Sequence, residues 1–237
     1  MSGAVGTSAS NAPVWEVSLP SGRTSSSFGA PQRGTLVIRD MTGGEERISL
    51  PKPVAKILHA KKASGEIEPS SRAELLYIVW DLARSCARTR IERLIDRREY
   101  SSQEVRDKLA ADGYPKSVIE ECLSYACEIG LVSDARYADS YIRSKVYSGW
   151  GMGRIVRELS QRGIDVTTVK GWPYDYLDPE DEVSRAINLA RTKRVSSTRA
   201  YEKLVRFLCS RGYATGVAMK AARQVLDERD DATLVDF

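Results

Sequence analysis

The stretch that decides the fold reads SSQEVRDKLAADGYP, residues 101–115. Within it, Val105, Leu109, Gly113 and Tyr114 follow one another at steps of four, four and one. Apolar residues four apart share one face of a helix, and Gly suits the left-handed backbone just past a helix end. The apolar residue after Gly can then fold back on the last turn. The stretch therefore predicts a helix that ends at its glycine.

The same spacing recurs twice, in GMGRIVRELSQRGI at 151–164 and in RAYEKLVRFLCSRGY at 199–213. The three glycines lie 50 and 49 residues apart. A unit that recurs at such a period indicates a helical repeat array. We predict structural roles for the positions that share the spacing: Val105, Leu109, Gly113, Tyr114, Ile155, Leu159, Gly163, Ile164, Leu204, Leu208, Gly212 and Tyr213.

We predict an all-α protein of tandem three-helix repeats in an elongated, curved array. Residues 1–34 are rich in Ser, Gly and Ala and are expected to be a disordered tail, and residues 35–70 to hold a small β-hairpin around Gly43-Gly44 and a linker. The helical units are expected in this order: repeat 1 with its leading helix at 71–148, repeat 2 at 149–177 with helix 134–148 as its first helix, repeat 3 at 178–230, and a loose C-terminus at 231–237.

Three local patterns give further expectations about the helical part. The leading helix carries apolar residues at steps of four and three, which predict one buried stripe: Leu76, Trp80, Ala83, Ala87, Ile91 and Leu94. The run Gly149-Trp-Gly-Met-Gly153 is interpreted as a flexible link between repeats. Trp172-Pro173 is expected to shorten the last helix of the second repeat.

Composition and motifs argue against catalysis and metal binding. The single histidine is His59, and the four cysteines show no Cys-x-x-Cys pair, so zinc ligands at the usual spacings are missing. No Walker, Rossmann or Gly-x-Ser-x-Gly motif occurs. We expect no enzyme activity, no catalytic residue, no cofactor and no metal. No apolar run approaches the ~20 residues that span a bilayer, and no signal peptide is recognised, so we expect a cytoplasmic protein without membrane contact.

Basic residues gather on the helices outside the predicted core. Eight basic residues oppose one acidic residue between Arg185 and Arg211, and six oppose three between Asp134 and Gly163. A charge run is often only a solvated face, but its recurrence in consecutive repeats favours an anionic partner: nucleic acid, an acidic protein surface, or a filament of both. The candidate contact residues are Arg143, Lys145, Arg154, Arg157, Arg162, Arg191, Lys193, Arg194, Arg199, Lys203, Arg206 and Arg211.

A wider pattern surrounds these motifs. It comprises the run Gly130-Leu-Val-Ser-Asp-Ala-Arg-Tyr-Ala138, then Gly151, Arg154-Ile155, Glu158-Leu159 and Gly163-Ile164, with related residues at Arg98-Glu-Tyr-Ser101 and Arg206-Phe-Leu208. From about Arg72 to Asp227 the chain resembles the RecX family of bacterial recombination regulators. It departs from the family pattern near Trp172-Pro173 and at Ser133, where many relatives have an acid.

The resemblance implies a non-enzymatic regulator whose partners are the RecA protein and the RecA–DNA filament. Such a regulator lodges in the helical groove of the filament and inhibits filament extension, ATP hydrolysis and strand exchange, and so acts in recombination, DNA repair and SOS control. We expect a monomer. The alternative is a direct DNA-binding helical protein of helix-turn-helix type, a transcriptional or architectural regulator. Weak binding of single- or double-stranded DNA is compatible with both hypotheses.

Overall fold

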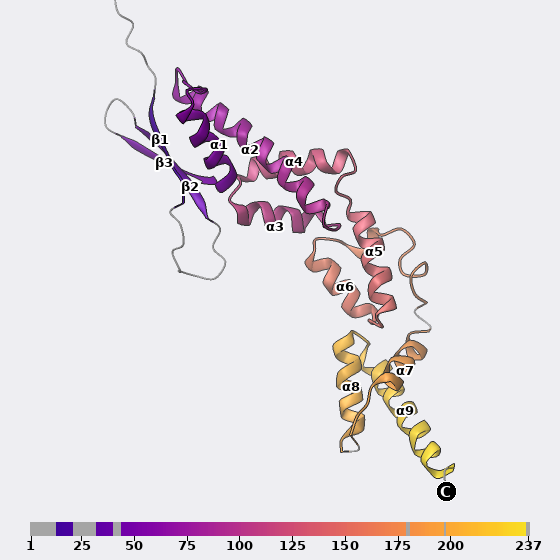
Figure 1. Ribbon diagram of the computed structural model, residues 1–237. Helices are drawn as coiled ribbons and strands as arrows, with labels where there is room; N and C mark the ends of the chain where they lie inside the picture. The colour runs from indigo at the N-terminus through magenta and orange to yellow at the C-terminus, as the bar shows by residue number, and fades with distance from the viewer. Residues whose placement is uncertain (1–12, 21–31, 40–43, 179–180, 197, 236–237) are drawn as a thin grey trace, which may run out of the picture. The chain divides into compact units, whose positions relative to one another are not determined.

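The computed structural model describes residues 13–20, 32–39, 44–178, 181–196 and 198–235, with the backbone alone described from residue 230 onward. The chain forms two compact units, Met1–Val132 and Ser133–Phe237 (Figure 1). The predicted fold class is confirmed, since the protein is mostly helical, with three-helix domains and a small sheet near the N-terminus.

A three-stranded antiparallel sheet opens the first unit, with β1 (Val14–Ser18), β2 (Arg33–Arg39) and β3 (Glu45–Pro51) in that order. Strands β2 and β3 form the predicted hairpin, although Gly43 itself lies outside the described residues. Strand β1 comes from the segment that we expected to be disordered, so that prediction is wrong for 14–18. The reason is Trp15, whose side chain is only 8% exposed and contributes to the core. Residues 1–12 and 21–31 lie outside the described ones.

Helix α1 (Lys52–Ala63) follows β3 directly and covers one face of the sheet (Figure 1). Leu36 on β2 packs in one core with Val54 and Leu58 on α1. A Cβ atom added at Gly34 would lie 2.3 Å from the Cβ of Ala55, so glycine permits the close approach of strand and helix. The sheet therefore reaches the helical part of the unit through α1.

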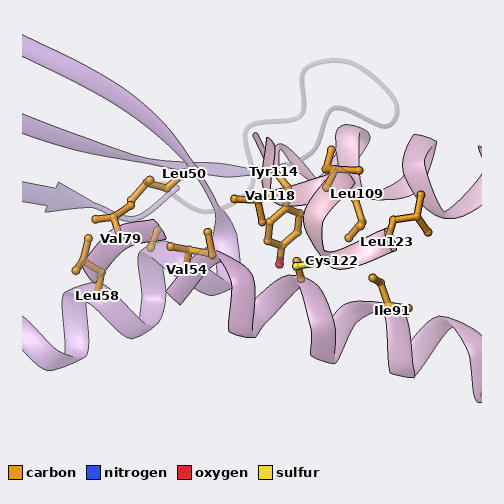
Figure 2. Close-up of a cluster of buried hydrophobic side chains, with 14 of the residues drawn as sticks. Leu50, Val54, Leu58, Val79, Ile91, Leu109, Tyr114, Val118, Cys122 and Leu123 are labelled. Atoms are coloured by element: carbon orange, nitrogen blue, oxygen red, sulfur yellow. The ribbon is translucent and has the colours of Figure 1, made fainter. Parts of the chain in front are cut away.

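Helices α2 (Arg72–Ile95), α3 (Ser102–Asp112) and α4 (Lys116–Glu128) complete the first unit. Their buried side chains form one continuous core with the sheet and α1, part of which Figure 2 shows. The predicted stripe of α2 is correct from Ala83 onward, but Leu75 and Val79 are buried in place of Leu76 and Trp80, and Trp80 is 36% exposed. Leu75 and Leu76 both lie about two turns before Ala83, and Val79 and Trp80 both lie about one turn before it. Helical spacing alone therefore does not choose between the two pairs. Packing against α1 decides between them, and Figure 2 shows Val79 beside Leu58.

The second unit contains two groups of helices, each with its own core. The first group consists of α5 (Asp134–Tyr147), α6 (Met152–Gln161) and the short 3₁₀ helix η1 (Val166–Thr168). As expected near Trp172-Pro173, residues 165–178 contain no α-helix. The second group consists of α7 (Glu182–Thr192), α8 (Ala200–Arg211) and α9 (Thr215–Val235).

Helix α9 continues to Val235, so the prediction of a loose C-terminus from residue 231 is wrong for 231–235. The sequence offers a physical reason. Neither Gly nor Pro interrupts the segment that follows Asp230, and Ala232 and Leu234 favour a helix.

The three repeated stretches end their helices in the same way. Gly113, Gly163 and Gly212 have φ angles of 93°, 75° and 96°. In each case the N–H of the next residue donates a hydrogen bond to the carbonyl of the preceding leucine, at N···O distances of 3.1, 3.0 and 3.2 Å for Leu109, Leu159 and Leu208. This is the six-to-one bond of a Schellman cap. The nine apolar residues of the spacing are all buried.

Candidate partner-binding surface

All twelve basic residues that we predicted as contacts belong to the second unit. The surroundings of their side chains divide them into two sets. In one set the positive charge pairs with an acid or, for Lys145, lies against two aromatic rings. In the other set no acid among the described residues pairs with the charge, and at most one ring lies near it.

Tyr141 and Trp150 hold three of these cations on and just after α5 and α6. Trp150 meets Tyr141 edge to face, with ring centres 6.4 Å apart. The Arg154 guanidinium carbon lies 3.8 Å from the Trp150 ring centre, and Lys145 Nζ lies 4.8 Å from the same point. Arg162 lies 5.0 Å from the Tyr141 ring centre. Such cation–π contacts fix the direction of long side chains that would otherwise be mobile.

Glu158 compensates two of the same cations. Its carboxylate accepts a hydrogen bond of 2.8 Å from Arg162 and lies 3.7 Å from Arg154 Nε. The hydrogen bond from Arg162 lowers the pKa of the Glu158 carboxyl. Arg154 also donates to the main-chain carbonyl of Ser210 at 3.0 Å. Arg154 and Arg162 therefore contribute to the packing of the unit.

Two further predicted contacts form ion pairs. Arg143 Nε lies 3.1 Å from both carboxylate oxygens of Asp139, and this bonding lowers the Asp139 pKa. Arg191 donates two hydrogen bonds to Glu228, of 2.8 and 3.0 Å. Bidentate pairs of this kind hold the guanidinium in one orientation. Neither arginine offers an uncompensated charge to a partner.

The second set, which we name the open basic set, lies on α6, on α8 and in the segments that flank α8. No acidic side chain in the described part of the chain pairs with any of its members, and each is at least partly exposed. Lys193 and Arg211 lie 5.2 and 5.4 Å from the Phe207 ring centre. The open basic set consists of Arg157, Lys193, Arg194, Arg199, Lys203, Arg206 and Arg211.

Sequence reasoning missed two exposed basic residues of α9, Lys220 and Arg223. Acidic residues in the C-terminal half of α9 offset its basic ones in a count over the whole helix. A count restricted to residues 215–225, which contain no acid, finds both.

The run Gly149–Gly153 is a packed junction, so its interpretation as a flexible link is wrong. The N–H of Gly151 donates to the carbonyl of Arg211 at 2.9 Å. A Cβ atom at Gly151 would lie 2.6 Å from the carbonyl carbon of Gly212. Arg185 donates to the Trp150 carbonyl at 2.8 Å. These glycines are required because α6 begins against the end of α8, and chain flexibility is not their role.

The junction places one member of the open basic set beside α8. Arg157 lines a cavity of about 380 Å³ together with Met152, Cys209 and Tyr213. Glu182 accepts a hydrogen bond from the N–H of Met152 at 3.2 Å and so caps the start of α6. The two helix groups of the second unit therefore present their open cations from one joined body.

Metal-ligating clusters and membrane-spanning helices are both absent from the described residues. Within them, no group of three or more His, Cys, Asp or Glu side chains could hold a metal ion. None of the helices that the structure describes is long and apolar enough to cross a membrane. The four cysteines are free thiols, and burial raises the pKa of the Cys86 and Cys122 thiols.

Comparison with known proteins assigns the chain to a family. Residues 87–125 match the first three-helix domain of RecX and residues 133–170 match the second. The regulatory protein RecX of Thermobifida fusca (strain YX) is 33% identical over 153 residues, which cover 61% of this chain and 80% of that protein. The chain belongs to the RecX family. RecX of Vibrio vulnificus (strain CMCP6) is 34% identical over 134 residues, 55% of this chain and 86% of that protein.

RecX proteins are regulatory and non-enzymatic. A crystal structure of regulatory protein RecX shares the fold, with a TM-score of 0.52 and 17% identity over 90% of this chain and all of that one. The two matched RecX domains contain α3, most of α4, α5, α6 and η1. Most of the open basic set lies outside both matches, on and around α8.

Proposed function

We propose that this RecX-family chain binds the RecA–DNA filament in its helical groove and restrains filament extension, ATP hydrolysis and strand exchange. Family membership implies RecA as the partner. The observation that supports the contact surface is the open basic set, whose charges have no acidic partner among the described residues. A filament of protein and nucleic acid is strongly anionic and attracts such a surface.

The proposal requires only binding. A protein that occupies the surface where RecA subunits add or move can inhibit filament extension without a catalytic residue of its own. The packed junction at Gly149–Gly153 supports this, because it joins α6 to α8 and keeps their cations together. Rigid presentation lowers the entropy that is lost on binding.

We further propose that residues 178–230 are a third repeat, after 71–148 and 149–177. Helices α7, α8 and α9 share one core, and α8 ends in the same glycine cap as α3 and the α6 segment. A protein with three such units would contact a helical partner over a longer path than one with two.

The DNA-dependent ATPase of RecA tests the regulatory proposal. We expect the chain to inhibit it at stoichiometries that decorate the filament. Full ATPase activity at such stoichiometries would reject the proposal, because filament binding without inhibition is not regulation of this kind.

Charge reversal tests the open basic set. The double variant Arg157→Glu, Arg206→Glu should raise the concentration for half-maximal inhibition by roughly tenfold or more, since reversed charges repel an anionic partner. The matched control is Lys56→Glu with Arg97→Glu, which makes the same change in net charge in the first unit, where both side chains are exposed. Equal inhibition by both double variants would exclude the proposed surface, provided that their circular dichroism spectra match that of the wild type.

Direct DNA binding is the second candidate, favoured by the uncompensated Arg199, Lys203 and Arg206 along α8. It predicts binding to labelled DNA without RecA, with an affinity that falls steeply as salt rises. If DNA is bound tightly without RecA and the ATPase of RecA is unaffected, the second candidate replaces the first.

A further inference from the structure

A cavity of about 560 Å³ lies in the first unit, whereas the proposed filament-binding surface belongs to the second. Its walls come from the start of α1, from α2, and from the turn between α3 and α4, and include Lys52, Ile57, Cys86, Arg90, Arg93 and Tyr114. The volume is within the roughly 300–1,000 Å³ typical of small-molecule sites. The α1 side of this cavity lies outside both matched RecX domains.

The charge on these walls is positive. Arg90 forms an ion pair of 2.7 Å with Asp112, so its charge is compensated. Lys52 donates a hydrogen bond of 2.6 Å to the neutral Gln32 side chain, and Arg93 pairs with no acid in the part of the chain that the structure describes. Two positive charges, those of Lys52 and Arg93, therefore remain for a ligand.

Helix α1 begins at the same cavity. Lys52 and Pro53, its first two residues, both line the wall. No side chain caps this end of the helix, and its first turn contains no acidic residue. The N-terminal end of a helix carries a partial positive charge and attracts anions. The helix dipole thus adds to the positive potential of the two side chains.

Tyr114 is a second and independent feature of the cavity. Its side chain is only 5% exposed, and its hydroxyl has no hydrogen-bond partner among the described residues. Figure 2 shows the hydroxyl pointing toward α2, the helix that supplies Cys86 and Arg90 to the wall. The hydroxyl oxygen itself is not fully enclosed, so it can be reached by a hydrogen-bonding partner that enters the cavity. This donor is available to a ligand oxygen.

We propose that the cavity binds a phosphate monoester with a small organic group. A phosphate monoester carries about −1.5 to −2 charge at pH 7 and three strong acceptor oxygens. This charge matches Lys52 and Arg93, and the oxygens can accept hydrogen bonds from these two side chains and from the Tyr114 hydroxyl. A single carboxylate offers one charge and two oxygens, which would leave a cation uncompensated. Pro53, Ile57 and Cys86 provide apolar contact for the organic group.

Titration calorimetry with the full chain tests the site. The probes are adenosine monophosphate, O-phosphoserine and adenosine. Both phosphates should bind at least about tenfold more tightly than adenosine, since charge-assisted hydrogen bonds to phosphate carry the recognition. Tighter binding of adenosine monophosphate would identify the ligand as a free metabolite. Tighter binding of O-phosphoserine would identify it as a phosphorylated side chain. If neither phosphate binds at millimolar concentration, or adenosine binds as tightly as its phosphate, the proposal is overturned.

Variants locate the binding. Arg93→Gln should weaken phosphate binding about tenfold and Tyr114→Phe about threefold, because each removes donors and leaves the fold in place. Lys56→Gln is the matched control, as Lys56 is exposed on α1 and does not line the cavity. Unchanged affinity in Arg93→Gln, or an equal loss in Lys56→Gln, would overturn the assignment. Circular dichroism of each variant checks that it is folded.

Discussion

At the scale of single residues, Gly212 is constrained both by its backbone angle and by the close approach of another helix. Its φ of 96° is unfavourable for residues with a side chain. In addition, a Cβ atom at Gly212 would lie 2.3 Å from the Cβ of Arg154 and 2.5 Å from its backbone nitrogen. Gly212 therefore ends α8 and also lets α6 begin beside it.

Replacing Gly212 by alanine should destabilise the second unit more than a helix cap alone would. The left-handed backbone costs about 1–2 kcal/mol, and the clash with Arg154 adds about 1–3 kcal/mol. The control is Gly65→Ala, because Gly65 has a φ of 71° and open space around the added methyl group. Thermal unfolding of both variants measures the difference. Equal losses of stability would show that the contact with Arg154 relaxes without cost.

The sequence predicts the first constraint on Gly212, its role as a helix cap, but does not predict the second, its contact with Arg154. The cap of Gly212 is predictable because its hydrogen bonds join residues only a few positions apart, Leu208 and Cys209 to the residues after them. The contact with Arg154 is not predictable, since it joins residues far apart in the chain. For the same reason the sequence alone predicts a flexible link at Gly149–Gly153, whose packing partners lie far away in the chain.

At the scale of elements, α5 and α6 are held together by a cluster of charges and rings. Glu158 lies at its centre, bonded to Arg162, and the side chains of both residues are mostly shielded from solvent. The lowered pKa of Glu158 means that the folded state favours the ionised carboxylate. This contribution to stability is present above the unfolded pKa of Glu, about 4.3, and is lost as pH falls through the lower folded value.

The variant Glu158→Gln should therefore lose stability at pH 7 and lose less than the wild type when the pH falls from about 5 to 3. Melting temperatures at several pH values measure this. Glu202→Gln is the control, because Glu202 is exposed on α8 and pairs with no base in the described residues. Parallel pH profiles for the wild type and Glu158→Gln would show that other carboxyls carry the acid sensitivity.

The sequence predicted the basic faces of α6 and α8, and helical spacing separates some of their cations. Arg154 has an acid four positions on, Glu158, whereas Arg157 has no acid three or four positions away. In the structure Arg154 lies against Trp150, while Arg157 is exposed and without an acidic partner among the described residues. Trp150 and Glu158 are close to Arg154 in the sequence, and only the hydrogen bond to Ser210 on α8 needs the tertiary structure.

At the scale of the molecule, the sheet is part of the first helical unit. Its buried residues and those of α1 to α4 form one core that extends from Trp15 to Val132. The sheet and α1 lie outside the matched RecX domains. They nevertheless stabilise the first matched domain, residues 87–125, because they share its core. Lys62 strengthens the attachment, since it lies over the Trp15 ring and donates a hydrogen bond to the Trp15 carbonyl.

Trp15→Ala should consequently destabilise helices that are far from it in sequence. We expect a loss of about 3–5 kcal/mol. Hydrogen exchange should become faster in α1 and α2, while α7 to α9 of the second unit keep their protection. Val14→Ala is the control in the same strand, because Val14 is 60% exposed. Unchanged exchange in α2 would show that the sheet is an independent attachment.

The residues alone determined the helices, their glycine caps, the repeat and the resemblance to RecX, because these signals are carried by neighbours within a few turns. Packing decided that Glu228 compensates Arg191, why Gly151 must lack a side chain, and that Trp15 belongs to the core. Each of these depends on atoms brought together from distant positions in the chain, where the free energy of a contact cannot be seen in local spacing. The cavity at Tyr114 is of the same kind, since α1, α2 and the turn between α3 and α4 enclose it only after the chain has folded.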